Sequence, residues 1–87
     1  MKHIHIEPLA QEHLRQWIAT DRKIALKIMD LFVAIQRDPF EGIGKPEPLK
    51  HNRKGYWSRR VTQEHRLVYL VTDDSVIIAS CMGHYEA

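Results

Sequence analysis

Apolar and polar residues alternate over residues 2–6, and the pattern then changes to a helical period. The alternation predicts a short strand, which Pro8 ends. Pro8 also suits the first turn of a helix, and the apolar residues after it recur at helical spacing: Ala10, Leu14, Trp17 and Ile18. The N-terminal part of the chain is therefore predicted to be a strand followed by an amphipathic helix.

A second helix is predicted after an interruption at Thr20 and Asp21, where Asp21 can cap its N-terminus. Its apolar residues lie at positions i, i+4, i+7, i+8 and i+11: Ile24, Ile28, Leu31, Phe32 and Ile35. Asp38 followed by Pro39 ends the segment. Because the connection is so short, the two helices are expected to form an antiparallel hairpin.

The remainder of the chain predicts a sheet. Residues 40–48 contain two glycines and two prolines and are predicted to form a loop. Three strands are predicted after it, at about residues 56–62, 66–72 and 75–82, with a tight turn at residues 72–75. The order βααβββ predicts one small α+β domain over residues 1–87, an antiparallel sheet with an N-terminal strand and the helical hairpin on one face.

The composition, 44% apolar and 28% charged, is that of an ordinary soluble domain. The apolar runs are too short to span a bilayer, and the first residues lack the apolar region of a secretory signal. The single cysteine, Cys81, excludes an internal disulfide and fits a reducing compartment. We therefore expect a cytoplasmic protein with no membrane contact, in which Cys81 is buried and unreactive.

The charge is unevenly distributed. Residues 45–66 carry seven basic and two acidic side chains, a net charge of +5, whereas the other 65 residues carry six basic and nine acidic ones, a net charge of −3. A basic face of this kind is typical of a surface that binds phosphate groups.

Side chains near these cations suggest chemistry as well as binding. Glu47 precedes the predicted sheet, Arg66 lies within it, and His84 and Tyr85 follow it. Cleavage of RNA by its own 2′-hydroxyl needs a base for that hydroxyl, cations for the phosphate, and an acid for the leaving 5′-oxygen. Carboxylate, guanidinium and imidazole groups can fill these roles without a metal ion. Taken alone, these residue types indicate such chemistry only weakly.

A family resemblance strengthens this interpretation. The segment GKPEPLKHNRKGYWSRRVTQEHRLVYLVTDDSVIIASCMGHY resembles the YoeB/Txe-type toxins of the RelE superfamily, which belong to type II toxin–antitoxin systems. The blocks GKPEPLKHN, WSRR and EHRLVY together make the resemblance specific, and it extends to WIATDRKI and RDPFEG.

The resemblance implies a ribosome-dependent endoribonuclease that cuts mRNA in the decoding site and needs no cofactor. It also implies inhibition by a YefM-type antitoxin, a homodimer, and binding to operator DNA only within the antitoxin complex.

The family motifs also imply residue roles. By matching KPEP, EHRLVY and the terminal His-Tyr, the resemblance makes Glu47 the general base, Arg66 the phosphate and transition-state ligand, and His84 the general acid, with Tyr85 beside it. The resemblance also implies three RNA-binding residues. Lys50 and Arg60, matched in PLKHN and WSRR, hold RNA phosphates, and Tyr85 contacts RNA as well.

Two features depart from the family pattern. The chain adds Glu86 and Ala87 after the tyrosine, which places an anionic side chain near His84. In addition, a two-residue turn at Asp73 and Asp74 gives a strand register that places Tyr85, rather than His84, on the face of Arg66. His84 shares that face only if a bulge or the chain end shifts the register, and Gly83 is the candidate position.

Other readings of the same residues stay open. Arg59 and Arg60 are adjacent and must point to opposite faces of a strand, so one of them is expected to be a solvated charge or a partner contact. His51 and His65 are expected to be hydrogen-bonded structural residues, and Trp57 to be core rather than a base-stacking surface.

The spacing of His3, His5 and His84 does not resemble a metal site. The alternative functions are a non-catalytic ParE-like toxin, and a degenerate toxin that acts only with its antitoxin as a co-repressor.

Overall fold

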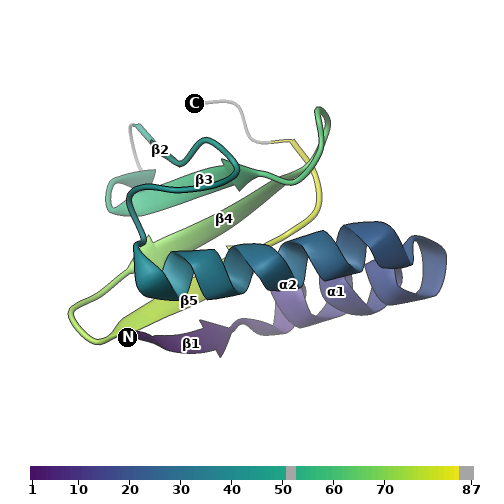
Figure 1. Cartoon of the computed structure of the whole chain (residues 1–87), viewed down its shortest axis with the longest axis horizontal. Coiled ribbons are helices and arrows are strands. Elements are labelled where there is room, and N and C mark those ends of the chain that lie inside the picture. The colour runs from purple at the N-terminus through teal and green to yellow at the C-terminus, as the bar shows by residue number, and fades with distance from the viewer. Residues whose placement is uncertain (51–52, 85–87) are drawn as a thin grey trace.

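The computed structural model describes residues 1–50 and 53–84 (Figure 1). Two helices, α1 (Pro8–Thr20) and α2 (Arg22–Arg37), lie together on one side of the sheet (Figure 1). Asp21 alone separates them: its backbone N–H donates to the Trp17 carbonyl at the end of α1, and its carboxylate accepts from the Ile24 N–H at the start of α2. The predicted helical hairpin, including its Asp21 cap, is confirmed.

The sheet has five strands in the order β1-β5-β4-β3-β2. The strands are β1 (His3–Ile6), β2 (Glu47–Pro48), β3 (Tyr56–Arg60), β4 (Arg66–Val71) and β5 (Ser75–Ser80). β2, β3, β4 and β5 pair antiparallel, but β1 pairs parallel to β5, so the sheet is mixed rather than purely antiparallel. The α+β class is confirmed. The two-residue strand β2 was predicted as loop, because two residues that include a proline carry no alternation to detect.

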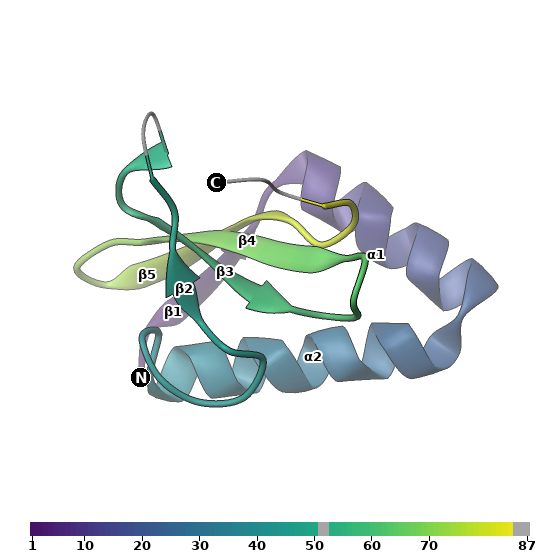
Figure 2. The same ribbon diagram turned by 90° about the horizontal axis from the view of Figure 1, so that it is seen from above.

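The side of the sheet that faces the helices forms the core. Apolar side chains of α2 pack against alternate residues of the central strands, among them Leu67 and Tyr69 of β4 and Val76 and Ile78 of β5. Figure 2 shows the sheet from above, with α2 running along one of its sides. Since strand residues alternate between faces, the even-numbered residues of β3 and β4 point away from the helices. No helix within residues 1–50 and 53–84 is long and apolar enough to cross a membrane.

Arg59 is the main correction to the predicted core. It does point to the face opposite Arg60, but its side chain is completely buried rather than solvated. Its guanidinium group donates to the carbonyls of three loop residues and to the Tyr69 hydroxyl; the loop residues are Asp38, Glu41 and Ile43. A buried cation is tolerated when all its donors find acceptors. Arg59 therefore fastens the loop between α2 and β2 to the core.

Tyr69 completes this arrangement. Its hydroxyl accepts from Arg59 Nε at 3.1 Å and donates to the Pro39 carbonyl at 2.7 Å. Burial raises the pKa of Tyr69, an effect that outweighs the hydrogen bond and positive charge of Arg59. The loop is held at its far end by the Arg60 N–H, which donates to the Gly44 carbonyl at 2.6 Å. Arg59, Tyr69 and the backbone of Arg60 thus fix the path of the chain toward Glu47.

Candidate active site

The strand register gathers polar side chains on the face of the sheet opposite the helices, which we call the open face. Glu47 in β2 lies opposite Ser58 in β3, and Ser58 lies opposite Val68 in β4. Two residues after Ser58 in β3, Arg60 lies opposite Arg66 of β4. Directly paired residues of antiparallel strands project to the same side. A carboxylate, a hydroxyl and two guanidinium groups therefore share one patch of the open face.

Arg66 lies at the centre of this patch. Its Nη1 donates to the Ser58 hydroxyl at 3.1 Å, and its Nη2 lies 3.7 Å from Glu47 Oε1. The Arg66 side chain is 16% exposed, whereas that of Glu47 is 59% exposed. The guanidinium is thus oriented by a buried serine, and the carboxylate keeps access to solvent and to a ligand.

Two arginines directly opposite each other are unfavourable on electrostatic grounds. Arg60 and Arg66 occupy such a pair at the end of β3 and the start of β4, and both are partly exposed. A bound anion would relieve the repulsion, and a phosphate could accept parallel hydrogen bonds from either guanidinium.

A β-bulge decides which residues at the chain end reach the open face. Tyr69 pairs with Ile78 in the register set by the two-residue turn, but Val68 pairs with Ser80, so Ala79 is an extra residue in β5. The sequence made a shift of register the condition for His84 to share this face, with Gly83 as the candidate position; a shift does occur, at Ala79. It moves Ser80 to the open face.

His84 follows this shifted segment and is exposed. It lines a small cavity of about 90 Å³ together with Arg53 and with Val68 and Ser80 of the open face. His84 therefore lies on the side of the sheet that carries Glu47 and Arg66.

The segment that precedes His84 is held by side chains from elsewhere in the fold. Trp17 Nε1 donates to the Cys81 carbonyl at 2.9 Å, and the Cys81 N–H donates to His13 Nδ1 at 3.2 Å. The Gly83 N–H donates to His65 Nδ1 at 2.9 Å. His65 is thus a hydrogen-bonded structural residue, as predicted.

Both histidine rings accept these hydrogen bonds through Nδ1. Burial lowers the pKa of His13, partly offset by the charge of Glu12, which favours the neutral ring that can accept from Cys81. Cys81 is completely buried, and burial raises the pKa of its thiol to about 11. The predicted burial of Cys81 is confirmed, and the raised pKa disfavours the reactive thiolate.

Comparison with known proteins identifies the family of the chain. Residues 7–85 match the family described as a YoeB-like toxin of bacterial type II toxin–antitoxin systems. The chain is a member of the YoeB toxin family. Toxin YoeB of Escherichia coli strain K12 is 62% identical over 69 residues, which cover 79% of this chain and 82% of that protein.

Two solved structures extend the comparison to the fold. The YoeB dimer from Staphylococcus aureus is 47% identical, with a TM-score of 0.89, and the match covers 97% of this chain and 98% of that one. The chain matched in the heterotetrameric YoeB–YefM toxin–antitoxin complex from the same organism is 46% identical, with a TM-score of 0.87, and the match covers 98% and 99% of the two chains. The resemblance to YoeB toxins inferred from the sequence is confirmed.

The structure brings together some of the residues that the YoeB motifs single out, and others lie apart or outside the described residues. Glu47, Arg60 and Arg66 share one patch, and His84 lies on the same side of the sheet. Lys50 is exposed at the end of the β2 segment, and its carbonyl accepts from the Arg53 N–H. Tyr85, Glu86 and His51 lie outside the described residues.

Sequence reasoning missed the residues that hold this patch and the chain end in place. Ser58 in WSRR is 1% exposed and orients Arg66, although its small polar side chain gave no signal. His13 and Trp17 lie on α1, 64 or more residues from Cys81 in sequence. Only the tertiary fold brings them to the end of β5. Trp57 is partly buried against the core and packs against Phe40, with ring centroids 5.1 Å apart.

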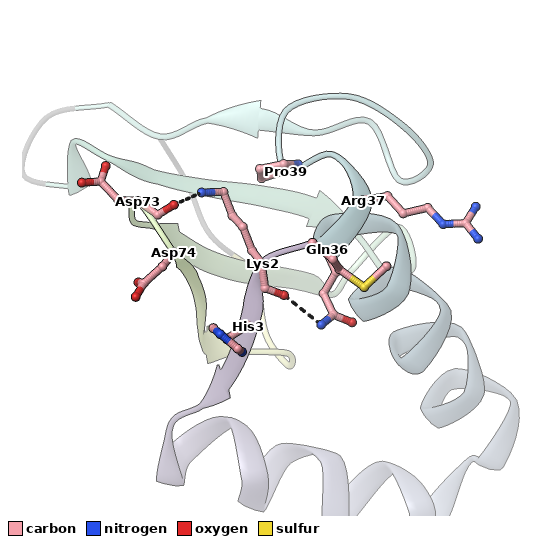
Figure 3. Close-up of a pocket in the computed structure, with 8 residues that line it drawn as sticks. Lys2, His3, Gln36, Arg37, Pro39, Asp73 and Asp74 are labelled. Carbon is pink, nitrogen blue, oxygen red and sulfur yellow. Dashed lines mark hydrogen bonds between the residues drawn. The ribbon is translucent and has the colours of Figure 1, made fainter.

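A separate cavity of about 340 Å³ lies at the opposite end of β4 from Arg66, between residues 1–3, the end of α2 and the β4–β5 turn (Figure 3). There Lys2 Nζ donates to the carbonyls of Thr72 and Asp73, and the Gln36 side chain donates to the Lys2 carbonyl. These contacts fasten the N-terminus to the turn. Within residues 1–50 and 53–84, no group of three or more His, Cys, Asp and Glu side chains is placed to hold a metal ion.

Proposed function

We propose that the protein is the toxin of a type II toxin–antitoxin system and acts as a ribosome-dependent endoribonuclease that cleaves mRNA in the decoding site. The observation that carries the proposal is the contact of Glu47 with Arg66 on an open sheet face, with Arg60 opposite Arg66. Membership of the YoeB toxin family supports the toxin role. The contact supplies a carboxylate beside a guanidinium pair, which a non-catalytic binding surface does not require.

The proposed reaction is transfer of the phosphodiester to the neighbouring 2′-hydroxyl. The Glu47 carboxylate takes the proton of this hydroxyl, whose oxygen attacks phosphorus. The bond from phosphorus to the 5′-oxygen breaks, and His84 in its protonated form gives a proton to that oxygen. The products are an upstream fragment with a 2′,3′-cyclic phosphate and a downstream fragment with a 5′-hydroxyl. Exchange with water restores both side chains.

Arg66 acts on the reacting phosphate itself. Negative charge grows on the non-bridging oxygens as the 2′-oxygen attacks, and guanidinium donors already in place stabilise it without reorganisation. Arg66 is suited to this role because Ser58 fixes its orientation and its side chain is largely shielded from water. Arg60 and Lys50, both accessible to solvent, hold flanking phosphates.

The ribosome supplies alignment that the free protein lacks. A basic surface attracts RNA of any sequence, but attraction alone does not bring the 2′-oxygen, phosphorus and 5′-oxygen into line. We therefore expect free RNA to be cut far more slowly than mRNA on the ribosome. The absence of a cofactor requirement is part of the same proposal.

The proposed partners are a YefM-type antitoxin and a second copy of the chain. The Staphylococcus aureus proteins that resemble this chain occur as a YoeB dimer and as a YoeB–YefM heterotetramer. An acidic antitoxin segment would cover Arg60 and Arg66 and compete with RNA, and operator DNA would be bound only through that complex. The proposed location, the cytoplasm, is where such a toxin meets ribosomes.

The test is to incubate the purified protein with ribosomes programmed with a defined mRNA and to map the new RNA ends. The proposal predicts a discrete cut in the decoding site, insensitive to EDTA at levels that leave the ribosome intact. Intact mRNA with blocked translation would indicate a non-catalytic toxin. Intact mRNA with normal translation, from a protein that still binds its antitoxin, would indicate a ParE-like toxin with another target or a co-repressor.

A further inference from the structure

The backbone immediately before His84 is held at Gly83 by two hydrogen bonds. The Gly83 N–H donates to His65 Nδ1 at 2.9 Å, and its carbonyl accepts from the Arg66 N–H at 2.9 Å. Gly83 has a φ of 95°, a conformation that residues with a side chain rarely adopt. One glycine is therefore fixed on both sides by two successive residues, His65 and Arg66.

His65 is itself held in the turn between β3 and β4. Its N–H donates to the Thr62 hydroxyl, and its carbonyl accepts from the N–H groups of Val61 and Thr62. Its ring meets the Trp17 ring edge to face, with centroids 4.8 Å apart and planes at 84°. With backbone and ring both fixed, Nδ1 points at one place, the Gly83 N–H.

We propose that His65 is a positioning residue, whose Nδ1 holds the Gly83 N–H so that His84 is presented to the leaving 5′-oxygen. This inference rests on the proposed function of His84. It assigns His65 a role through the backbone and not through contact with RNA.

The hydrogen bond between Gly83 and His65 is exposed, which indicates that it orients the chain end rather than stabilises the fold. Gly83 is exposed, so its N–H finds water when the imidazole acceptor is lost, and the free energy of unfolding changes little. Glycine, however, moves freely between conformations once it is released, and the next residue moves with it. A displacement of about 1 Å at a catalytic group is enough to lower a rate by about 10²-fold.

Two substitutions separate the acceptor from the ring. His65→Asn keeps an acceptor oxygen at the position of Nδ1 but loses the ring, whereas His65→Phe keeps the ring against Trp17 and loses the acceptor. We expect single-turnover cleavage on ribosomes to fall about 10- to 100-fold in His65→Phe and to stay within about fivefold of wild type in His65→Asn. His5→Phe, the same change at an exposed histidine of β1, is the matched control and should leave the rate unchanged.

A substrate with a sulfur in place of the 5′-bridging oxygen identifies the step. Its leaving group needs no proton, so the defects of His84→Ala and His65→Phe should both largely disappear. The double variant should cleave the ordinary substrate no more slowly than His84→Ala alone. If His65→Phe cleaves the ordinary message at the wild-type rate, or is equally slow with oxygen and sulfur leaving groups, the positioning role is wrong.

Amide hydrogen exchange at Gly83 tests the contact without any cleavage. In the free protein, His65→Phe should speed exchange of the Gly83 N–H about threefold to tenfold, and His65→Asn should not. If the wild type cleaves no mRNA but His65→Phe still speeds exchange of the Gly83 N–H, the contact is supported and the proposed function is refuted. Unchanged exchange in a folded His65→Phe variant would refute the contact itself. If His65→Phe does not fold, the test rests on His65→Asn. Exchange at Gly83 and cleavage at the wild-type rates in His65→Asn support the inference, and faster exchange or slower cleavage overturns it.

Discussion

Tyr69→Phe removes one hydroxyl from the interior and tests how the loop before Glu47 is held. The Tyr69 side chain is completely buried, and its hydroxyl accepts from Arg59 Nε at 3.1 Å while donating to the Pro39 carbonyl at 2.7 Å. The substitution keeps the ring and leaves both partners without this hydroxyl. The remaining donors of Arg59 keep their carbonyl acceptors on the loop.

The expected cost follows from the two bonds. A neutral hydrogen bond contributes about 0.5–1.5 kcal/mol to stability, and one to a charged group contributes about 1.5–3 kcal/mol. Because the partners of the Tyr69 hydroxyl are buried and are left without it, the substitution should cost about the sum of the two contributions. The free energy of unfolding should therefore fall by about 2–4 kcal/mol. For a chain of this length, that corresponds to a decrease of about 10–25 °C in Tm.

The assay is urea-induced unfolding followed by tryptophan fluorescence, with thermal unfolding in parallel. Tyr56→Phe, at the partly buried Tyr56 on the open face, is the matched control and should cost less than about 0.5 kcal/mol. A loss of less than about 0.5 kcal/mol in Tyr69→Phe would show that the hydroxyl does not fasten the loop.

Three further predictions concern the open face and the buried thiol. Glu47→Gln keeps the size of an exposed side chain and should lower single-turnover cleavage about 10²- to 10⁴-fold with unchanged folding; near wild-type cleavage would exclude Glu47 as the base. Arg66→Lys should lower cleavage by about 10²-fold or more because the planar fork is lost, and a steep fall in Tm would instead mark Arg66 as structural. The pKa of Cys81 is raised from 9.0 to about 11, so its contribution to stability is complete below pH 9 and is lost as the pH rises toward 11. Wild type should therefore lose about 2 kcal/mol more than Cys81→Ala between pH 8 and pH 11 in urea unfolding, and equal losses would contradict the assignment.

The regular part of the fold could be predicted from the sequence because its signals are local. The apolar stripe of α2 and its Asp21 cap lie within one segment, and the short interruption at Asp21 implies a hairpin. The tight turn at residues 72–75 likewise sets the register of β4 and β5 near the turn, as far as Tyr69 and Ile78.

The features that shape the site depend on contacts distant in sequence. The bulge at Ala79 has no signature of its own, since the residue is an ordinary apolar one in a β-rich segment. The burial of Arg59 depends on loop carbonyls 16 to 21 residues away, and an arginine in a strand is ordinarily read as exposed. The roles of His13 and Trp17 depend on where α1 packs. The residue types of Glu47, Arg66 and His84 indicate RNA cleavage only weakly, and the family motifs supply the roles proposed for them.

Attack by the 2′-hydroxyl is tested most directly with a message that carries a single 2′-deoxy nucleotide at the mapped cut position, presented on the ribosome. Because the proposed attacking oxygen belongs to the RNA itself, the substituted message should remain intact while the unmodified one is cut to a 2′,3′-cyclic or 3′-phosphate end and a 5′-hydroxyl end. Cleavage of the deoxy message at the same position, or a product with a 5′-phosphate, would contradict attack by the 2′-hydroxyl and with it the roles assigned to Glu47 and His84.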